Sequence, residues 1–301
     1  MLGVDPATVA RRWQRLEAEG LAWVHAAVNT DVDQDLVRAW VEVRVAGVQV
    51  DKVAGQLAAE PNVLSLRLTA GERELLALLA NVDLDEMAQF VGTHIAAIDG
   101  VRSTRTHLIT EAPITGADWR LNVLKPDERA AMEAGSTPVL GRRARLDAAD
   151  AAIATELERD GRAGVTEIAE RAGLGISTVR RRLPGLLSSG TLMVHCDVSR
   201  QVSGYPVSAV YFASVPAVHL EKVTSSLRTL PGLRLCSIVA GPDNLVLDVW
   251  LESLRDVHQL ENFVSKRLKS LDVRIADRAV TLRTYKHHGR VLDVEGRAVI
   301  Q

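Results

Sequence analysis

The sequence predicts an α+β fold built from winged helix-turn-helix units and ferredoxin-like βαββαβ domains, both duplicated within the chain. Three observations lead to this fold class. The chain repeats itself at a fixed offset. A helix, a short helix, a glycine turn and a third helix precede a short strand. The segments that follow alternate in the order strand, helix, strand, strand, helix, strand.

The repeat has an offset of 170 residues. Residues 3–12 align with residues 173–182, and the same register pairs Gly71 with Gly241. A register that holds over such a length indicates two copies of one unit. We expect the first copy to be truncated, because no residues before it match residues 146–170.

Composition limits the class of protein. The 301-residue chain has 36 Lys and Arg against 38 Asp and Glu, a net charge of −2, so any nucleic-acid surface must be a local patch. Two cysteines, Cys196 and Cys236, are too few for a disulfide framework. Neither a signal peptide nor an apolar run of about 18 residues is found. These features predict a reduced, cytoplasmic protein without a membrane partner.

The second copy begins with three predicted helices and a strand. Apolar residues recur at helical spacing over 146–157, and Thr166 is placed to cap a second, short helix. After a glycine turn, a third helix is expected from about Ile176 to Gly190, followed by a strand over 191–198. This order predicts a helix-turn-helix with a small wing, whose third helix would enter the major groove of double-stranded DNA.

The candidate DNA-contacting residues lie near the start of each third helix. Arginine can donate two hydrogen bonds to guanine, and serine or threonine can bind bases or phosphates. The candidates are Ser177, Thr178, Arg180, Arg181 and Arg182 in the second copy and Thr8, Arg11 and Arg12 in the first. The alternative is that these arginines only form a solvated helix face.

Each copy continues with alternating strands and helices. In the second copy we expect strands over 207–215, 233–239, 245–251 and 273–285, with helices over 217–229 and 254–271. In the first copy we expect strands over 39–46, 63–69, 73–80 and 101–109, with helices over 51–59 and 83–98. The order βαββαβ predicts an antiparallel sheet backed by two helices.

Both third helices depart from a regular pattern. In the first copy, Asp5 and Pro6 favour a helix start, but Trp13 and Leu16 lack the supporting helices that would cover them. In the second copy, Pro184 lies inside the third helix, where a proline removes a hydrogen bond. We expect a kink or an early end there.

The ordered combination of Gly-Leu-x-x-Ser-Thr-Val-x-x-Arg from Gly173, a short wing and a βαββαβ domain resembles the Lrp/AsnC family of feast/famine regulators. The resemblance covers residues 2–109 and 146–286. It implies a DNA-binding transcription regulator that forms a homo-dimer or a higher homo-oligomer. It also implies control by a small effector, commonly an amino acid, bound around a Gly-x-Asp turn.

In this sequence the residues that the resemblance assigns to the effector are Gly241, Asp243 and Asn244, with Gly71 in the first copy. A carboxylate beside backbone N–H groups could meet the ammonium and the carboxylate of an amino acid. The alternative is that these residues only form a hairpin turn. Because Arg73 replaces the aspartate in the first copy, the two turns should not bind a ligand in the same way.

An enzyme is not expected, because no catalytic motif is found. No cofactor or metal is predicted either: His25 and His195 are expected to be structural, and His287 and His288 to form an exposed tail. Two alternatives stay open, a siroheme decarboxylase-like enzyme of the same architecture and an effector-binding partner that no longer binds DNA.

The predicted domains follow from the repeat. They are a partial helix-turn-helix over 1–36, a ferredoxin-like domain over 37–111, a linker over 112–145, a winged helix-turn-helix over 146–204 and a second ferredoxin-like domain over 205–301.

Overall fold

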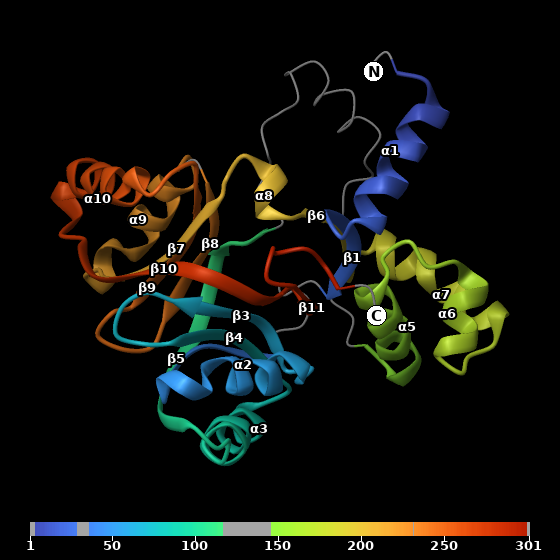
Figure 1. Ribbon diagram of the computed structural model, residues 1–301, viewed down its shortest axis with the longest axis horizontal. Helices are drawn as coiled ribbons and strands as arrows, with labels where there is room; N and C mark the ends of the chain where they lie inside the picture. The colour runs from blue at the N-terminus through green and yellow to red at the C-terminus, as the bar shows by residue number, and fades with distance from the viewer. Residues whose placement is uncertain (1–3, 29–35, 117–145, 231, 300–301) are drawn as a thin grey trace. The chain divides into compact units, whose positions relative to one another are not determined.

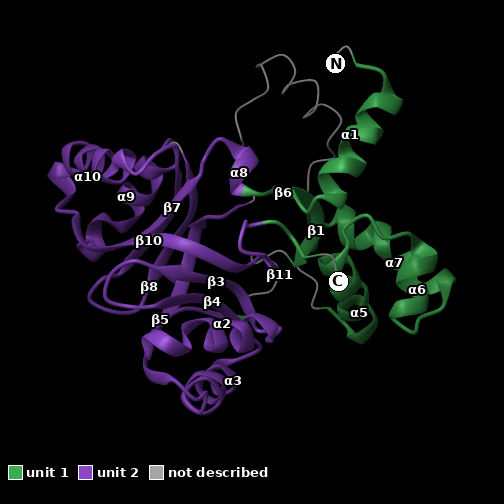
Figure 2. Cartoon of the chain, in the orientation of Figure 1, with its two compact units in different colours: residues 1–36, 121–199, 297–301 green, residues 37–120, 200–296 purple. Residues whose placement is uncertain are grey.

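The computed structural model describes residues 4–28, 36–116, 146–230 and 232–299, so most of the expected linker lies outside the described residues. The chain forms two compact units (Figure 2). Unit 1 comprises residues 1–36, 121–199 and 297–301, and unit 2 comprises residues 37–120 and 200–296. Each unit therefore combines segments of both sequence copies.

Unit 1 holds the predicted three-helix arrangement and a two-stranded sheet (Figure 1). Its elements are α1 (Pro6–Ala18), β1 (Ala22–Val28), α5 (Ala148–Arg159), α6 (Val165–Arg171), α7 (Ile176–Ser188) and β6 (Leu192–Val198). The wing strand β6 pairs antiparallel with β1, its counterpart in the first copy. Helices α5, α6 and α7 pack around Ile153, Ile168 and Val179, and Ala26 of β1 joins this core.

The helix ends in unit 1 follow from local side chains, with two corrections. Asp147 caps α5 and forms a capping box with Asp150, and Asp5 caps α1 ahead of Pro6. The predicted cap at Thr166 is wrong, because α6 already begins at Val165 and its N-cap is Gly164. The early end expected at Pro184 is also wrong, because α7 continues to Ser188.

Unit 2 contains both βαββαβ segments. The first is β2 (Val37–Val45), α2 (Val50–Ala59), β3 (Val63–Thr69), β4 (Leu75–Asn81), α3 (Leu84–Gln89), a π-helical turn (Phe90–Ile95) and β5 (Val101–Ile114). The second is β7 (Val207–Ser214), α9 (Leu220–Leu227), β8 (Leu233–Val239), β9 (Leu245–Leu251), α10 (Arg255–Arg267) and β10 (Arg274–His287). A short helix, α8 (Arg200–Ser203), precedes the second segment and a short strand, β11 (Arg290–Val291), follows it.

The strands of unit 2 form one closed barrel, which the sequence did not predict. The strand order is β11-β10-β3-β4-β2-β5-β8-β9-β7, and β10 pairs with β7 as well as with β3. Two antiparallel pairings join the copies: β10 with β3, and β5 with β8. Helices α2 and α3 lie on one side of the barrel, and α9 and α10 lie on another (Figure 1). Each copy therefore contributes half of the barrel wall and two outer helices.

The barrel has apolar cores under its outer helices and a mixed interior. An inner cluster around Trp40, Val210 and Phe212 is completely buried or nearly so. Arg67 and Asp248 form a bidentate ion pair, with Nη1 to Oδ1 at 2.8 Å and Nη2 to Oδ2 at 2.5 Å, and both are buried. A charged pair between strands of different copies thus ties the two halves together.

The prediction that His287 and His288 form an exposed tail is wrong for His287. His287 lies in β10, pairs with β11 and is buried. Its ring stacks on that of His288, with 4.2 Å between the ring centroids. No helix in the described part of the chain has the length and apolar character needed to cross a membrane.

Candidate functional site

Helix α7 presents the predicted DNA-contacting residues of the second copy. Val179 is fully buried against α5 and α6, so the opposite side of the helix faces outward. Ser177, Arg180 and Arg181 are exposed, and Thr178 is half-buried. Among the residues described, neither arginine has a hydrogen-bond or ion-pair partner. Their guanidinium groups are therefore available for base edges or phosphates.

Arg182, the last of these candidates, is directed toward α5 instead. Its Nη1 donates to Asp147 Oδ2 at 2.6 Å and to Asp150 Oδ1 at 2.9 Å. The pKa of Asp147 is lowered, first by the backbone N–H of Asp150 and then by the hydrogen bond from Arg182. Arg182 thus links α7 to the first turn of α5, a structural role that does not require DNA.

Helix α1 carries the candidates of the first copy. Arg11 and Arg12 are exposed, and Thr8 is half-buried with its backbone N–H donating to Asp5 Oδ2 at 3.2 Å. Val9 corresponds to the buried Val179 in the repeat but is 44% exposed. The arginines are accessible, while the helix lacks the packing that α7 receives.

The two hairpin turns predicted to bind an effector occupy equivalent places on the barrel. The backbone N–H ahead of each turn donates to the last strand of the other copy, at 2.8 Å to β10 and at 2.9 Å to β5. Gly71 and Gly241 have φ angles of 118° and 143°, which favour glycine. Both turns are therefore held against the opposite copy in a backbone conformation that other residues rarely adopt.

A cavity of about 520 Å³ contains residues of both turns. Arg73 of the first turn and Asp243 of the second, counterparts at the 170-residue offset, line it together. Its other lining residues are Glu42, Arg44, Glu72, Ser103, Thr104, Arg105, Phe212, Ala276 and Asp277. The cavity thus offers guanidinium groups, carboxylates and hydroxyls within one volume. Gly71, Gly241 and Asn244 are not among the lining residues.

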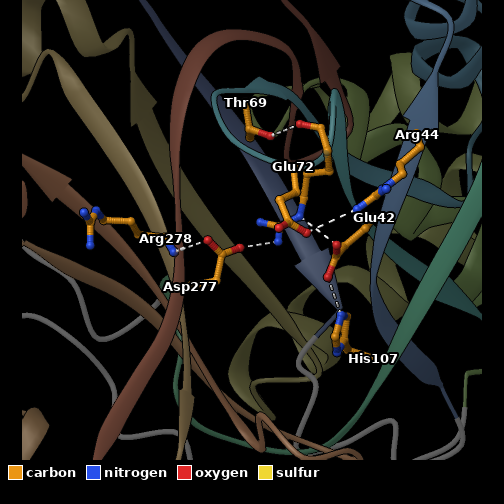
Figure 3. A network of polar contacts seen from close by, with 8 residues as sticks. Glu42, Arg44, Thr69, Glu72, His107, Asp277 and Arg278 are labelled. Atoms are coloured by element: carbon orange, nitrogen blue, oxygen red, sulfur yellow. Dashed lines mark hydrogen bonds and ion pairs between the residues drawn. The ribbon is translucent and has the colours of Figure 1, made fainter.

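Arg73 is the centre of a buried polar network at this cavity, and Figure 3 labels three other members of it, Glu42, His107 and Asp277. Its Nε donates to Glu42 Oε2 at 2.7 Å, and its Nη2 donates to Asp277. His107 Nε2 lies 2.7 Å from Glu42 Oε1, and the Arg73 guanidinium lies 4.8 Å from the centre of the Phe212 ring. The Nη1 of Arg73 is buried and has no hydrogen-bond partner among the described residues. One donor nitrogen of this guanidinium is therefore unsatisfied within the described part of the chain.

The charges of this network reinforce one another. Burial by itself would raise the pKa of Glu42, but the hydrogen bond from His107 and the charge of Arg73 outweigh it and lower that pKa. Likewise, burial would lower the pKa of Arg73, but Asp277 and Glu42 raise it. Glu42 and Arg73 are therefore both charged at neutral pH.

Asn244 has a different environment from Asp243. Its Nδ2 donates to the carbonyl of Val215 at 2.8 Å, and its Oδ1 accepts from the backbone N–H of Val215 at 2.9 Å. The side chain thus links the turn between β8 and β9 to the residue that follows β7. Its assignment to the effector stays a prediction, whereas Asp243 is placed at the cavity.

The sequence analysis missed three residues of this network: Glu42, His107 and Asp277. Glu42 carried a signal, because it interrupts the apolar strand between Val41 and Val43. A carboxylate in such a strand indicates a buried partner. The sequence has no comparable signal for His107 and Asp277, since their proximity depends on how the two copies join.

Two family models match the chain. A model described as the Lrp/AsnC ligand binding domain matches residues 38–118, and one described as the AsnC-type helix-turn-helix domain matches residues 146–186. The chain is 31% identical over 123 residues to the HTH-type transcriptional regulator LrpC of Bacillus subtilis, covering 40% of this chain and 83% of LrpC. It is 31% identical over 117 residues to the HTH-type transcriptional regulator LrpA of Mycobacterium tuberculosis, covering 38% of this chain and 78% of LrpA.

The likeness to one solved structure extends over both copies. The siroheme decarboxylase NirDL superposes on 95% of this chain and 84% of its own, with a TM-score of 0.60 and 14% sequence identity. At that identity the likeness concerns the fold.

Proposed function

The chain belongs to the Lrp/AsnC family of transcription regulators, and on this premise we propose that it binds double-stranded DNA through α7 and responds to a small effector in the cavity between its turns. One observation supports DNA binding most directly. Arg180 and Arg181 lie on the outward side of α7, and neither has a hydrogen-bond or ion-pair partner among the described residues. Because its buried side holds α7 in place, its free guanidinium groups can contact base edges when the helix lies in the major groove.

The test is binding to a promoter fragment measured by fluorescence anisotropy at fixed salt, because phosphate contacts make affinity depend strongly on salt. Arg180→Ala/Arg181→Ala should weaken binding at least tenfold. The matched control, Arg255→Ala/Lys266→Ala, removes the same charge from the exposed side of α10 and should leave binding unchanged. Equal affinities for the α7 variant and the wild type would contradict the proposal.

We infer further that two or more chains act together on DNA. The described part of each chain has one three-helix unit with a supported reading helix, while regulators that bind two half-sites need two such helices. Light scattering of the DNA complex should give at least two chains per fragment. A complex with a single chain would argue against a homo-dimer or a higher homo-oligomer.

For the effector we propose a zwitterion such as an amino acid. The cavity joins carboxylates, among them Asp243, to guanidinium groups, among them Arg105 and the free Nη1 of Arg73. Such a site can pair with an ammonium and a carboxylate at once. A screen of amino acids by thermal shift tests this, since a ligand that binds the folded state raises its melting temperature. The shift should vanish in Asp243→Asn and persist in Asp272→Asn, which lies outside the cavity.

The alternative function, siroheme decarboxylation, rests on the fold likeness. A tetrapyrrole with many carboxylates needs a predominantly basic pocket, whereas the lining of this cavity sets four carboxylates against three guanidinium groups: Glu42, Glu72, Asp243 and Asp277 against Arg44, Arg73 and Arg105. This charge favours the regulator. A visible absorbance band that stays with the protein after mixing with siroheme and gel filtration would favour the enzyme.

A further inference from the structure

The cavity that contains Arg73 lies where the two copies meet within the barrel. The strand pairings of one copy recur in the other, since β2 pairs with β4 and β5 as β7 pairs with β9 and β10. The two pairings that join the copies are likewise counterparts, because β3 pairs with β10 and β8 pairs with β5. The two halves of the barrel are therefore related by a local two-fold axis, which repeats each position of one copy in the other.

Three counterpart pairs line this cavity with both of their members: Glu42 and Phe212, Arg73 and Asp243, and Arg105 and Asp277. The first two pairs follow from the 170-residue offset. The third pair follows from the strand register, in which Arg105 lies opposite Glu42 and Asp277 lies opposite Phe212. Because positions related by the axis line the same cavity, the cavity lies on the axis, and the axis does not generate a second copy of it.

The counterparts differ in charge. In two of the three pairs the first copy supplies an arginine and the second copy supplies an aspartate. The arginines of the lining, Arg44, Arg73 and Arg105, all belong to the first copy, whereas the second copy contributes Asp243 and Asp277. Two identical copies would place like charges on both sides of a two-fold axis. The differences between the copies therefore create an asymmetric site on a symmetric barrel.

Most charges of the lining already have partners. Arg44 Nη2 donates to Glu72 Oε2 at 3.2 Å, and Arg73 donates to Glu42 and to Asp277. The Arg73 network also crosses the axis, since Glu42 belongs to the first copy and Asp277 to the second. These five charged groups thus compensate one another without a ligand.

Two charged side chains of the lining are left, Arg105 from the first copy and Asp243 from the second. Arg105 is exposed and Asp243 is half-buried, and neither side chain has a hydrogen-bond or ion-pair partner in the parts of the chain that the structure describes. The apolar residues of the lining, Phe212 and Ala276, both come from the second copy. A bound molecule would therefore meet a cation at one end and an anion at the other.

We propose that each chain binds one effector molecule, which lies across the local two-fold axis in a single orientation. This inference rests on the zwitterionic effector proposed above. The carboxylate of the effector pairs with Arg105 of the first copy and its ammonium with Asp243 of the second, while its apolar part contacts Phe212 and Ala276. A dicarboxylate, a diamine, or two ligands related by the axis would place like charges against Arg105 or Asp243.

The first experiment is isothermal titration calorimetry of the full chain with three probes: L-leucine, L-leucinamide, which lacks the carboxylate, and 4-methylpentanoate, which lacks the amino group. L-leucine should bind at one molecule per chain. Each analogue should bind at least tenfold more weakly, because it loses one charge-assisted contact. If a different amino acid gives the largest thermal shift, its own amide and its own desamino acid replace the two analogues.

The orientation is tested by removing one charge of the cavity at a time. Arg105→Gln should abolish the preference for L-leucine over L-leucinamide and keep the preference over 4-methylpentanoate. Asp243→Asn should do the reverse. Asp243→Arg, which gives both turns the same residue, should bind 4-methylpentanoate more tightly than L-leucine.

The matched controls are Arg102→Gln on the same strand as Arg105 and Asp272→Asn, which remove the same charges from exposed positions outside the cavity. Both should bind all three probes as the wild type does. Arg105 is exposed and Asp243 has no side-chain partner among the described residues, so circular dichroism should show their variants folded.

The outcomes separate this inference from the proposed effector. If no amino acid binds, the proposed effector is wrong and the inference fails with it. Binding at two molecules per chain would leave the effector standing and overturn the single site on the axis. Binding at one molecule per chain with the effects of Arg105→Gln and Asp243→Asn exchanged would overturn the orientation. Equal losses in Arg105→Gln and Arg102→Gln would show only general charge attraction and would overturn the role of Arg105.

Discussion

His25 and His195 are counterparts in the sequence repeat, and they are also direct cross-strand partners in the sheet of β1 and β6. Their ring centroids lie 5.5 Å apart. In all seven pairs of this sheet the two residue numbers add up to 220, so the pairing is symmetric about these histidines. The duplicated chain thus folds on itself with a local two-fold relation between its copies.

This register predicts a specific disulfide. In a Cys196→Ser background, His25→Cys/His195→Cys should oxidise within one chain, because directly opposed residues in an antiparallel pair have the Cα separation that a disulfide needs. The bond should be visible as a faster band in non-reducing electrophoresis. The matched control, Ala27→Cys/His195→Cys, moves one cysteine by two residues and should not oxidise. Similar oxidation of both variants would show that the register slips.

A second prediction concerns Glu42 and pH. Because its folded pKa is lowered, ionised Glu42 stabilises the barrel above the ordinary glutamate pKa of about 4.3, and this contribution is lost as pH falls through the lowered value. At pH 7, Glu42→Gln should reduce the free energy of unfolding by about 3 kcal/mol, the lower range for breaking a buried pair. Denaturant unfolding at pH 7 and in increasingly acidic buffers measures both effects.

The difference between wild type and Glu42→Gln should shrink below about pH 4.3. The control is Glu72→Gln, which removes the same charge from an exposed pair with Arg44 at 3.2 Å. It should change stability little at any pH, because exposed pairs contribute little. A pH-independent difference for Glu42→Gln would mean that its charge is not responsible.

A third prediction concerns the ion pair that joins the two halves of the barrel. Arg67→Met or Asp248→Leu alone leaves a buried charge without its partner and should cost about 3–5 kcal/mol. The double variant Arg67→Met/Asp248→Leu should cost less than either single variant, because neither member of this ion pair is left without the other. Urea unfolding of the four proteins gives the coupling energy. The exposed pair of Lys52 and Asp99, at 2.9 Å, is the matched control and should couple weakly.

The fold of each copy was predictable because its signals are local. Strands over 233–239 and 245–251 have the predicted bounds, since the turn Gly241-Pro242-Asp243-Asn244 separates the two apolar runs. The third helix at Ile176 was also found, from its glycine turn and apolar spacing. Helix starts were less certain. Thr166 was chosen as a cap, but Gly164 has the extended backbone that the N-cap requires.

The joining of the copies was not predictable in the same way. The pairings of β10 with β3 and of β5 with β8 cannot be recognised from the hydrophobic periodicity of these four strands. The cavity depends on these pairings, because they bring Arg73 and Asp277 together from positions distant in the sequence. Arg73 was noticed as a substitution in the turn, but its burial was not foreseen. Arg182 was predicted to meet DNA, whereas two carboxylates hold it.

The last prediction concerns Pro184, an exposed proline in the interior of α7. Proline has no N–H for the helical hydrogen bond to the carbonyl of Arg180, and in a helix interior it is about 3 kcal/mol less favourable than alanine. Pro184→Ala should therefore stabilise unit 1, by less than this value because proline also restricts the unfolded chain. Thermal unfolding measures the gain, and Ser188→Ala on the same helix is the matched control. Arg180 and Arg181 precede the proline, so DNA affinity should stay within about threefold of the wild type. The corresponding change in binding free energy is well below the roughly 1.4 kcal/mol that a tenfold change in affinity requires. A large change in affinity with Pro184→Ala would show that a kink in α7 positions the reading residues.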